Sequence, residues 1–354
     1  MRSTLAAIAV LALAGCTGTA STSTSALPPR LEDLDSGTEA LLIAAHALDG
    51  RTVWVSGTGG TVLRTVDRGA TWTGGTVPGA DTLQFRDVVP LGEDTALALS
   101  IGNGAASRIV RTTDGGGSWE TVWVNDDPDA FFDCLSFWDR DRGIAFSDAV
   151  DGRFVVIATA DGGDTWSPIE AEGLAAPEGA GGFAASGTCV ATRGTGTAWI
   201  ATGNSDRPGV LRTDDGGTTW AFAPAPVVAG EAKGLASVAF RDGSTGVAVG
   251  GDLTAPDAFA DAVAVSSDGG RTWAAGGRLP FPGAAYGVAY VPDSARGDGP
   301  DALVAVGPGG AALSRDDGRT WQLLSEGTFW GVAASGPSAV WLTGPEGRIV
   351  RVRL

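Results

Sequence analysis

Residues 65–72 read TVDRGATW, and the pattern behind these eight letters, Ser/Thr-x-Asp-x-Gly-x-Ser/Thr-Trp, occurs six times along the chain. The later copies read TTDGGGSW, TADGGDTW, TDDGGTTW, SSDGGRTW and SRDDGRTW. From the first copy to the last, successive motif aspartates are 47, 47, 54, 53 and 48 residues apart. A motif that returns at so regular a spacing indicates a chain built from repeated structural units.

The motif has the chemistry of a tight turn. An aspartate carboxylate accepts backbone N–H groups within a turn, and glycine permits a positive φ. The closing tryptophan begins the next strand and offers a large apolar surface for packing between units. We therefore interpret these residues as structural rather than catalytic: Asp67, Trp72, Asp114, Trp119, Asp161, Trp166, Asp215, Trp220, Asp268, Trp273, Asp316 and Trp321.

Each repeat unit also contains four strand-like segments. In the second unit these are LQFRDVVPL, TALALSI, SRIVRTT and, after the motif, ETVWV. Four antiparallel strands per repeat, arranged radially, describe a β-propeller. Six motifs give six blades, and residues 329–354 supply three strands of a seventh, whose fourth strand comes from residues 29–34. The sequence thus predicts an all-β, seven-bladed β-propeller over 28–354, its ring closed by pairing the N- and C-terminal strands.

The N-terminal segment predicts export. Residues 1–15, MRSTLAAIAVLALAG, contain one Arg followed by an apolar run too short to span a membrane. The run ends in Leu13-Ala14-Gly15-Cys16, which resembles a bacterial lipobox; the alternative is an ordinary secretory signal. We expect 1–15 to be a lipoprotein signal peptide and 16–27 to be a lipidated Cys16 with a flexible tether. This predicts a cell-envelope protein held to the membrane only by its lipid, on the periplasmic side of the outer membrane in a Gram-negative cell.

Composition excludes several functions. The net charge of −17 argues against nucleic-acid binding through phosphates. One His and three Cys without a CxxC motif cannot form a multi-histidine metal site or a zinc ribbon. The glycine clusters lie in turns with no helix after them, so they are not dinucleotide-binding motifs. We expect no metal, no cofactor and a monomer.

The motifs are identified as the Asp-box (BNR) repeats of sialidases and related propellers. Three segments, 54–72 (WVSGTGGTVLRTVDRGATW), 130–139 (AFFD-x-x-x-FWD) and 147–154 (SDAVDGRF), resemble the photosystem II stability/assembly-factor family more closely. Seven-bladed members of that family are assembly chaperones in photosynthetic organisms. Related exported proteins of other bacteria are sometimes labelled oxidoreductases. The resemblance implies a propeller that binds or helps to assemble a protein.

The longer loops indicate where a binding site lies. In the predicted strand order the Asp-box turns occupy one face, and the longer connections surround the mouth of the central channel on the other. Functional residues concentrate on such loops. The candidate binding residues, each of which could instead be a solvated or turn-stabilising side chain, are Arg108, Asp133, Asp148, Asp151, Arg153, Glu178 and Asp252. Cys134 and Cys189 occupy similar places in adjacent units, and alternation leaves open whether they form a disulfide.

Two functions remain from the sequence. The first is a non-catalytic envelope lipoprotein that acts as a protein-binding scaffold or assembly factor through this face. The second is a glycan-binding propeller or a sialidase-like glycoside hydrolase. Sialidase chemistry requires a Tyr nucleophile, and the two tyrosines, Tyr286 and Tyr290, lie on one predicted strand. We therefore predict no catalytic residues, and an unidentified envelope protein as partner in preference to a glycan.

Overall fold

The computed structural model describes residues 28–293 and 301–354, and this part of the chain is all-β apart from one short 3₁₀ helix. The predicted signal peptide, Cys16 and the tether lie outside the described residues. Within the described ranges there is no helix of the length and apolar character that crossing a bilayer requires. The predicted all-β class is therefore confirmed.

The strands form consecutive antiparallel sheets. The first half of the chain gives three four-stranded sheets in strand order. The first sheet contains β2 (Leu42–Ala47), β3 (Val53–Gly57), β4 (Thr61–Thr65) and β5 (Thr73–Thr76). The second contains β6 (Phe85–Pro90), β7 (Ala96–Ser100), β8 (Arg108–Thr112) and β9 (Glu120–Val124), with the 3₁₀ helix η1 (Gly104–Ala106) between β7 and β8. The third contains β10 (Phe132–Phe137), β11 (Gly143–Val150), β12 (Arg153–Thr159) and β13 (Ser167–Pro168).

The second half begins with an eight-stranded sheet that consists of two four-stranded groups joined by pairing of β15 with β18. Its strands are β14 (Val190–Arg193), β15 (Thr197–Ser205), β16 (Gly209–Thr213), β17 (Ala221–Pro224), β18 (Gly230–Phe240), β19 (Gly246–Asp252), β20 (Val263–Ser266) and β21 (Ala274–Ala275). The next sheet contains β22 (Gly287–Val291), β23 (Ala302–Gly307), β24 (Gly310–Ser314) and β25 (Gln322–Ser325).

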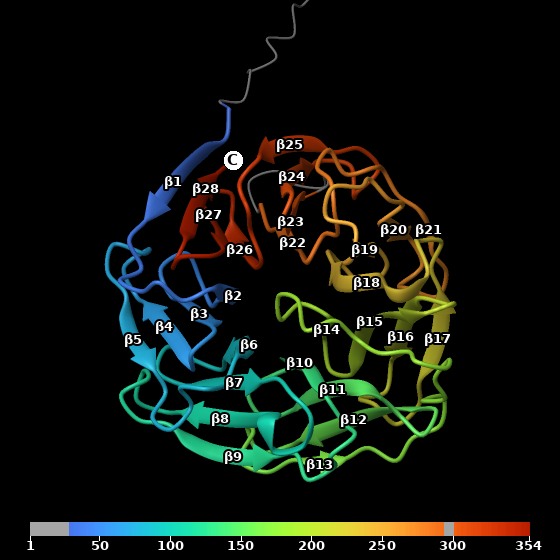
Figure 1. The fold of residues 1–354 in the computed structure, drawn as a ribbon, viewed down its shortest axis with the longest axis horizontal. Helices are drawn as coiled ribbons and strands as arrows, with labels where there is room; N and C mark the ends of the chain where they lie inside the picture. Colours follow the sequence, from blue (N-terminus) through green and yellow to red (C-terminus); the bar gives the residue numbers. More distant parts are fainter. Residues whose placement is uncertain (1–27, 294–300) are drawn as a thin grey trace, which may run out of the picture.

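The last sheet combines the two ends of the described chain. It contains β26 (Val332–Gly336), β27 (Ala339–Thr343), β28 (Ile349–Arg353) and β1 (Arg30–Leu34). β1 pairs antiparallel with β28, from Arg30 opposite Arg353 to Leu34 opposite Ile349. Figure 1 shows the sheets arranged around a common centre, with β2, β6, β10, β18, β22 and β26 nearest to it and β5, β9, β13, β17 and β25 at the rim.

Burial follows this arrangement. The middle strands β3, β7 and β24 are buried along their whole length, whereas the rim strands β5 and β13 are largely exposed. Strands covered on both faces have continuous apolar sequences, because neither face needs polar side chains. The core is accordingly divided into layers between neighbouring sheets: one cluster joins Trp54 and Val62 of the first sheet to Phe85, Val88 and Val110 of the next.

The Asp-box motifs form the turns expected from their chemistry. In the first copy, Oδ1 of Asp67 accepts the Thr71 N–H at 2.9 Å and the Thr65 hydroxyl at 2.7 Å. The Thr71 hydroxyl donates to Oδ2 at 2.6 Å, and these bonds lower the pKa of Asp67 to about 2. Some motif tryptophans pack edge-on against another aromatic ring: Trp119 lies 6.2 Å from Trp54 of the preceding sheet, and Trp166 lies 5.9 Å from Phe137 of its own sheet.

Candidate binding site at the centre of the ring

A cavity of about 520 Å³ lies near the centre of the ring. It is at the end of the sheets where the innermost strand of each sheet begins and the strand paired with it ends. The Asp-box turns are at the opposite ends of these sheets, so the cavity opens on the face that carries the longer connections, which we call the loop face. Its walls come from several sheets. They combine aromatic and aliphatic side chains with a few polar ones, and the principal members are Arg86, Phe131, Asp133, Asp148, Tyr286 and Trp330.

The long connection between β13 and β14 contributes Gly182, Phe183, Ala184 and Ala185 to the lining of this cavity. Its residues 181–188, GGFAASGT, which we call the central loop, extend towards the middle of the ring beside β14 (Figure 1). Arg86 of β6 donates to the carbonyl of Ala184 at 2.8 Å, and the Ser186 hydroxyl donates to the carbonyl of Tyr286 at 2.6 Å. The central loop is thus bonded to sheets that lie far apart around the ring.

The central loop is rich in glycine because space at the centre is narrow. A Cβ at Gly182 would lie 2.8 Å from Oδ2 of Asp133, and a Cβ at Gly187 would lie 2.7 Å from Oδ1 of Asp87. Gly181 is confined still more tightly, by the carboxyl of Asp148. A side chain at any of these positions would displace the carboxyl groups behind the loop.

Asp133 and Asp148 form a hydrogen-bonded carboxyl pair. Asp133 comes from β10 and is 1% exposed, and Asp148 comes from the neighbouring β11. Burial raises the pKa of Asp148 to about 6, although the Gly182 N–H, 2.8 Å from its Oδ1, and the bond from Asp133 oppose this. Burial, together with the nearby Asp148 charge, raises the pKa of Asp133 well above its usual range. Two carboxyls this close share a proton, which resides mainly on Asp133.

A β-bulge gives Asp133 its position. The pairing of β10 with β11 shifts between Phe132 and Cys134, so that Asp133 is the extra residue. Arg86 lies at the equivalent bulge of β6, between Phe85 and Asp87. A bulge re-aims the side chain of its extra residue, and here it turns both side chains towards the cavity. The sequence signal that could have identified Arg86 is a charged pair, Arg86 and Asp87, at the start of a strand that otherwise holds apolar residues.

The other predicted binding residues lie away from the cavity walls. Arg108 donates to the carbonyl of Ala105, Asp151 occupies the tight turn between β11 and β12 with φ 51°, and Glu178 is exposed. Arg153 donates to the carbonyl of Ala171 at 2.5 Å, and Asp252 pairs with Lys233 at 3.0 Å. Asp148 itself was expected in a connecting loop, but β11 continues to Val150 and places it on a strand. The sequence pattern does not point to the remaining cavity residues, among them Arg86, Phe131, Phe183, Asn204, Tyr286 and Trp330.

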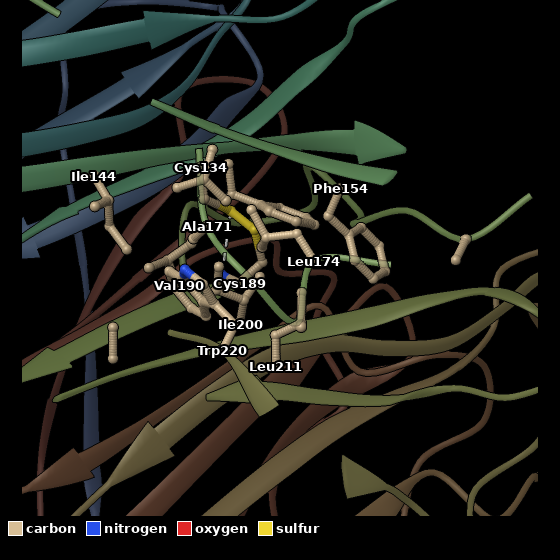
Figure 2. Close-up of a cluster of buried hydrophobic side chains, with 14 residues drawn as sticks. Cys134, Ile144, Phe154, Ala171, Leu174, Cys189, Val190, Ile200, Leu211 and Trp220 are labelled. Carbon is tan, nitrogen blue, oxygen red and sulfur yellow. Dashed lines mark hydrogen bonds between the residues drawn. A yellow bond between two sulfur atoms is a disulfide. The ribbon is translucent and has the colours of Figure 1, made fainter. Parts of the chain in front are cut away.

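The disulfide left open by the sequence is formed. Cys134 of β10 is bonded to Cys189, the last residue before β14, with their Cα atoms 6.0 Å apart. Figure 2 shows the bond inside a buried cluster that includes Ile144, Phe154 and Trp220. Because Cys189 directly follows the central loop, the bond fixes the base of this loop to the strand that carries Asp133.

Solved structures share this architecture. Superposition on YCF48 bound to a D1 peptide gives a TM-score of 0.63 over 93% of this chain and 96% of that chain, at 16% identity. The chain has the fold of YCF48. YCF48 from Cyanidioschyzon merolae gives 0.62, with 14% identity and 91% and 98% coverage. U3-55K gives 0.61, with 10% identity and 92% and 98% coverage. No protein-family model and no curated protein sequence matches the chain.

YCF48 is a photosystem II assembly factor with a β-propeller fold. In the sequence, the resemblance to the photosystem II assembly-factor propellers rests on three segments. In the fold, the similarity to YCF48 covers most of the chain. YCF48 and U3-55K share this architecture at similar TM-scores, so the fold does not by itself select a function.

The carboxyl pair predicts a specific pH dependence of stability. The unfolded chain releases an aspartate proton near pH 4, whereas folded Asp148 releases its proton near pH 6. The raised pKa therefore favours folding below about pH 4, and this contribution is lost as the pH rises through about 6. We expect the free energy of unfolding of wild type to fall by about 1–3 kcal/mol between pH 4 and pH 6 because of this group. Asp148→Asn should not show this fall.

Urea unfolding of wild type and Asp148→Asn across pH 4–7 measures this difference. Asp151→Asn is the matched control, because it removes a carboxylate from the adjacent turn and not from the cavity. Parallel pH profiles for wild type and Asp148→Asn would show that the pair does not bind a proton as described.

Proposed function

We propose that this chain is a non-catalytic envelope lipoprotein whose propeller holds a segment of a protein partner in the cavity of its loop face. In this proposal residues 1–15 are the signal peptide, Cys16 carries the lipid, and 28–354 form one seven-bladed domain. The eight-stranded sheet then counts as two blades, and the pairing of β1 with β28 closes the ring. The lipid would hold the protein at the periplasmic side of the outer membrane in a Gram-negative cell.

The observation that carries the proposal is the composition of the cavity. Phe131, Phe183, Tyr286 and Trp330 supply aromatic surface, and the carboxyl pair supplies a polar group at one point. Binding sites typically combine apolar walls with a few fixed polar groups, and aromatic side chains contribute most to protein recognition. The structure of YCF48 with a D1 peptide gives a precedent for peptide binding by this fold.

The geometry does not favour the glycoside hydrolase. The two carboxyl groups of retaining glycosidases are about 5 Å apart and those of inverting enzymes further, whereas Asp133 and Asp148 are hydrogen-bonded to each other. The two tyrosines are also separated: Tyr286 lines the cavity, while the Tyr290 hydroxyl donates to Asp317. Burial raises the pKa of Tyr286, which disfavours its use as a nucleophile, and the Tyr290 hydroxyl is already bonded to Asp317.

Affinity capture from crosslinked native envelopes tests the proposed function. We expect tagged wild-type protein to recover a defined partner, and the double variant Phe131→Ala/Trp330→Ala to recover it about tenfold less or worse, because buried aromatic contacts dominate such interfaces. Arg108→Ala is the control, since its side chain lies outside the cavity. Equal recovery by the cavity variant, or retention of glycan in place of protein, would contradict the proposal.

A further inference from the structure

The charged groups of the cavity differ in how much bonding capacity they have left. Arg86 is committed to the protein: one terminal nitrogen donates to the Ala184 carbonyl at 2.8 Å and the other to Oε1 of Gln84 at 3.0 Å. Its Nε is buried without a partner among the described residues, out of reach of a ligand. Arg86 therefore holds the central loop in place and offers little to an incoming anion.

The carboxyl pair has the opposite character. A carboxylate accepts up to about four hydrogen bonds, and Asp148, which is only partly buried, accepts one from the Gly182 N–H and one from Asp133. Oδ2 of Asp133 lies behind Gly182 and is fully buried, so, like Nε of Arg86, it does not reach the ligand. The free acceptor capacity that faces the cavity is therefore that of Asp148, which can take a donor from a ligand.

The aromatic walls suit the same ligand. The ring of Tyr286 meets that of Trp330 at 5.4 Å, edge to face, and Phe131 and Phe183 complete the apolar lining. Aromatic faces attract cations and pack against the aliphatic stem of a lysine or arginine. The net charge of −17 adds a field that draws cationic segments towards the protein.

We propose that the cavity is a recognition pocket for a lysine or arginine side chain of an extended protein segment, with the cationic head on Asp148, which Asp133 supports from behind, and the stem between Tyr286, Trp330 and Phe131. This inference rests on the proposed function and names the chemistry of the partner. Flanking apolar side chains of the segment occupy the rest of the roughly 520 Å³.

The proposal predicts how affinity changes with pH. The titratable groups that face Asp148 are Asp133 from β10, Arg86 from β6 and Tyr286 ahead of β22, and the other lining residues do not titrate. Only the carboxyl pair changes its charge near neutral pH, since the pKa of Tyr286 is raised by burial. Because the pKa of Asp148 is about 6, a cation binds about tenfold more weakly at pH 5 than at pH 7.5. Its binding near pH 6 releases about half a proton on average.

The test uses three synthetic peptides with full-length protein. They are acetyl-Leu-Phe-Lys-Phe-Leu-amide and the same peptide with acetyl-lysine or with glutamate at the centre, titrated calorimetrically at pH 5 and 7.5. We expect the lysine peptide to bind at least tenfold more tightly than either of the others at pH 7.5. Two buffers of different ionisation enthalpy at pH 6 then measure the released proton.

Two variants show which residue causes the preference for the lysine peptide. Asp148→Asn is expected to abolish the preference for lysine and its pH dependence, whereas Asp151→Asn, the matched loss of a carboxylate outside the cavity, leaves both unchanged. Equal binding of the lysine and acetyl-lysine peptides, tighter binding of the glutamate peptide, or no binding of the lysine peptide would overturn the cation assignment. None of these outcomes decides the proposed function, which the capture experiment tests with the native partner.

Discussion

Replacing Cys134 and Cys189 together by alanine is expected to lower the free energy of unfolding by about 2–5 kcal/mol. The bond joins residues that are 55 positions apart in the sequence, so it restricts a long segment of the unfolded chain. Both sulfurs also lie within a fully buried cluster with Ile144, Ile200 and Leu211. The loss therefore combines a less restricted unfolded state with weaker packing between β10 and β14.

Urea denaturation of the double variant and of wild type with its disulfide intact measures this loss of unfolding free energy. Val190→Ala is the packing control, because Val190 belongs to the same cluster and lies next to Cys189 but takes no part in the disulfide. Hydrogen exchange provides a second measurement: the Gly182 N–H, which is bonded to Asp148, should exchange faster in the double variant. A double variant that is no less stable than Val190→Ala, with unchanged exchange at Gly182, would show that the bond does not anchor the central loop.

The same region shows what the sequence could and could not predict. The Asp-box turns and their tryptophans were predictable because each depends on bonds within about eight residues. The pairing of Asp133 with Asp148 depends on the bulge between Phe132 and Cys134, and strict alternation cannot place a bulge. The bulge also shifts the parity of Cys134 relative to the residues before it, which is why alternation left the disulfide open.

The central loop was the feature least accessible from sequence. The segment GGFAASGT has no hydrophobic period, and its path is set by partners far away in the chain, such as Arg86 and the carbonyl of Tyr286. The cavity exists only because this loop, several strand starts and two bulges meet at one point. Single candidates such as Asp133 and Asp148 could be identified from the sequence, but their shared environment could not.

The largest single-residue effect is expected at Trp199. This side chain of β15 is 0% exposed and stacks on Phe240 with ring centroids 3.7 Å apart. Its Nε1 donates to the carbonyl of Gly269 at 2.8 Å, in the Asp-box turn of the next strand group. Trp199→Ala would leave a large cavity at the junction of two strand groups and an unsatisfied carbonyl at Gly269. We therefore expect it to lower the free energy of unfolding by about 3–5 kcal/mol.

A comparison of Trp→Phe variants separates packing from the hydrogen bond. Trp54 is equally buried on β3, but its Nε1 has no hydrogen-bond partner within the described part of the chain. Both replacements by phenylalanine remove similar volume, and only Trp199→Phe also removes a bond. Urea unfolding should therefore show Trp199→Phe to be about 1 kcal/mol more destabilising than Trp54→Phe. Equal losses would mean that the hydrogen bond to Gly269 adds nothing to the packing of Trp199.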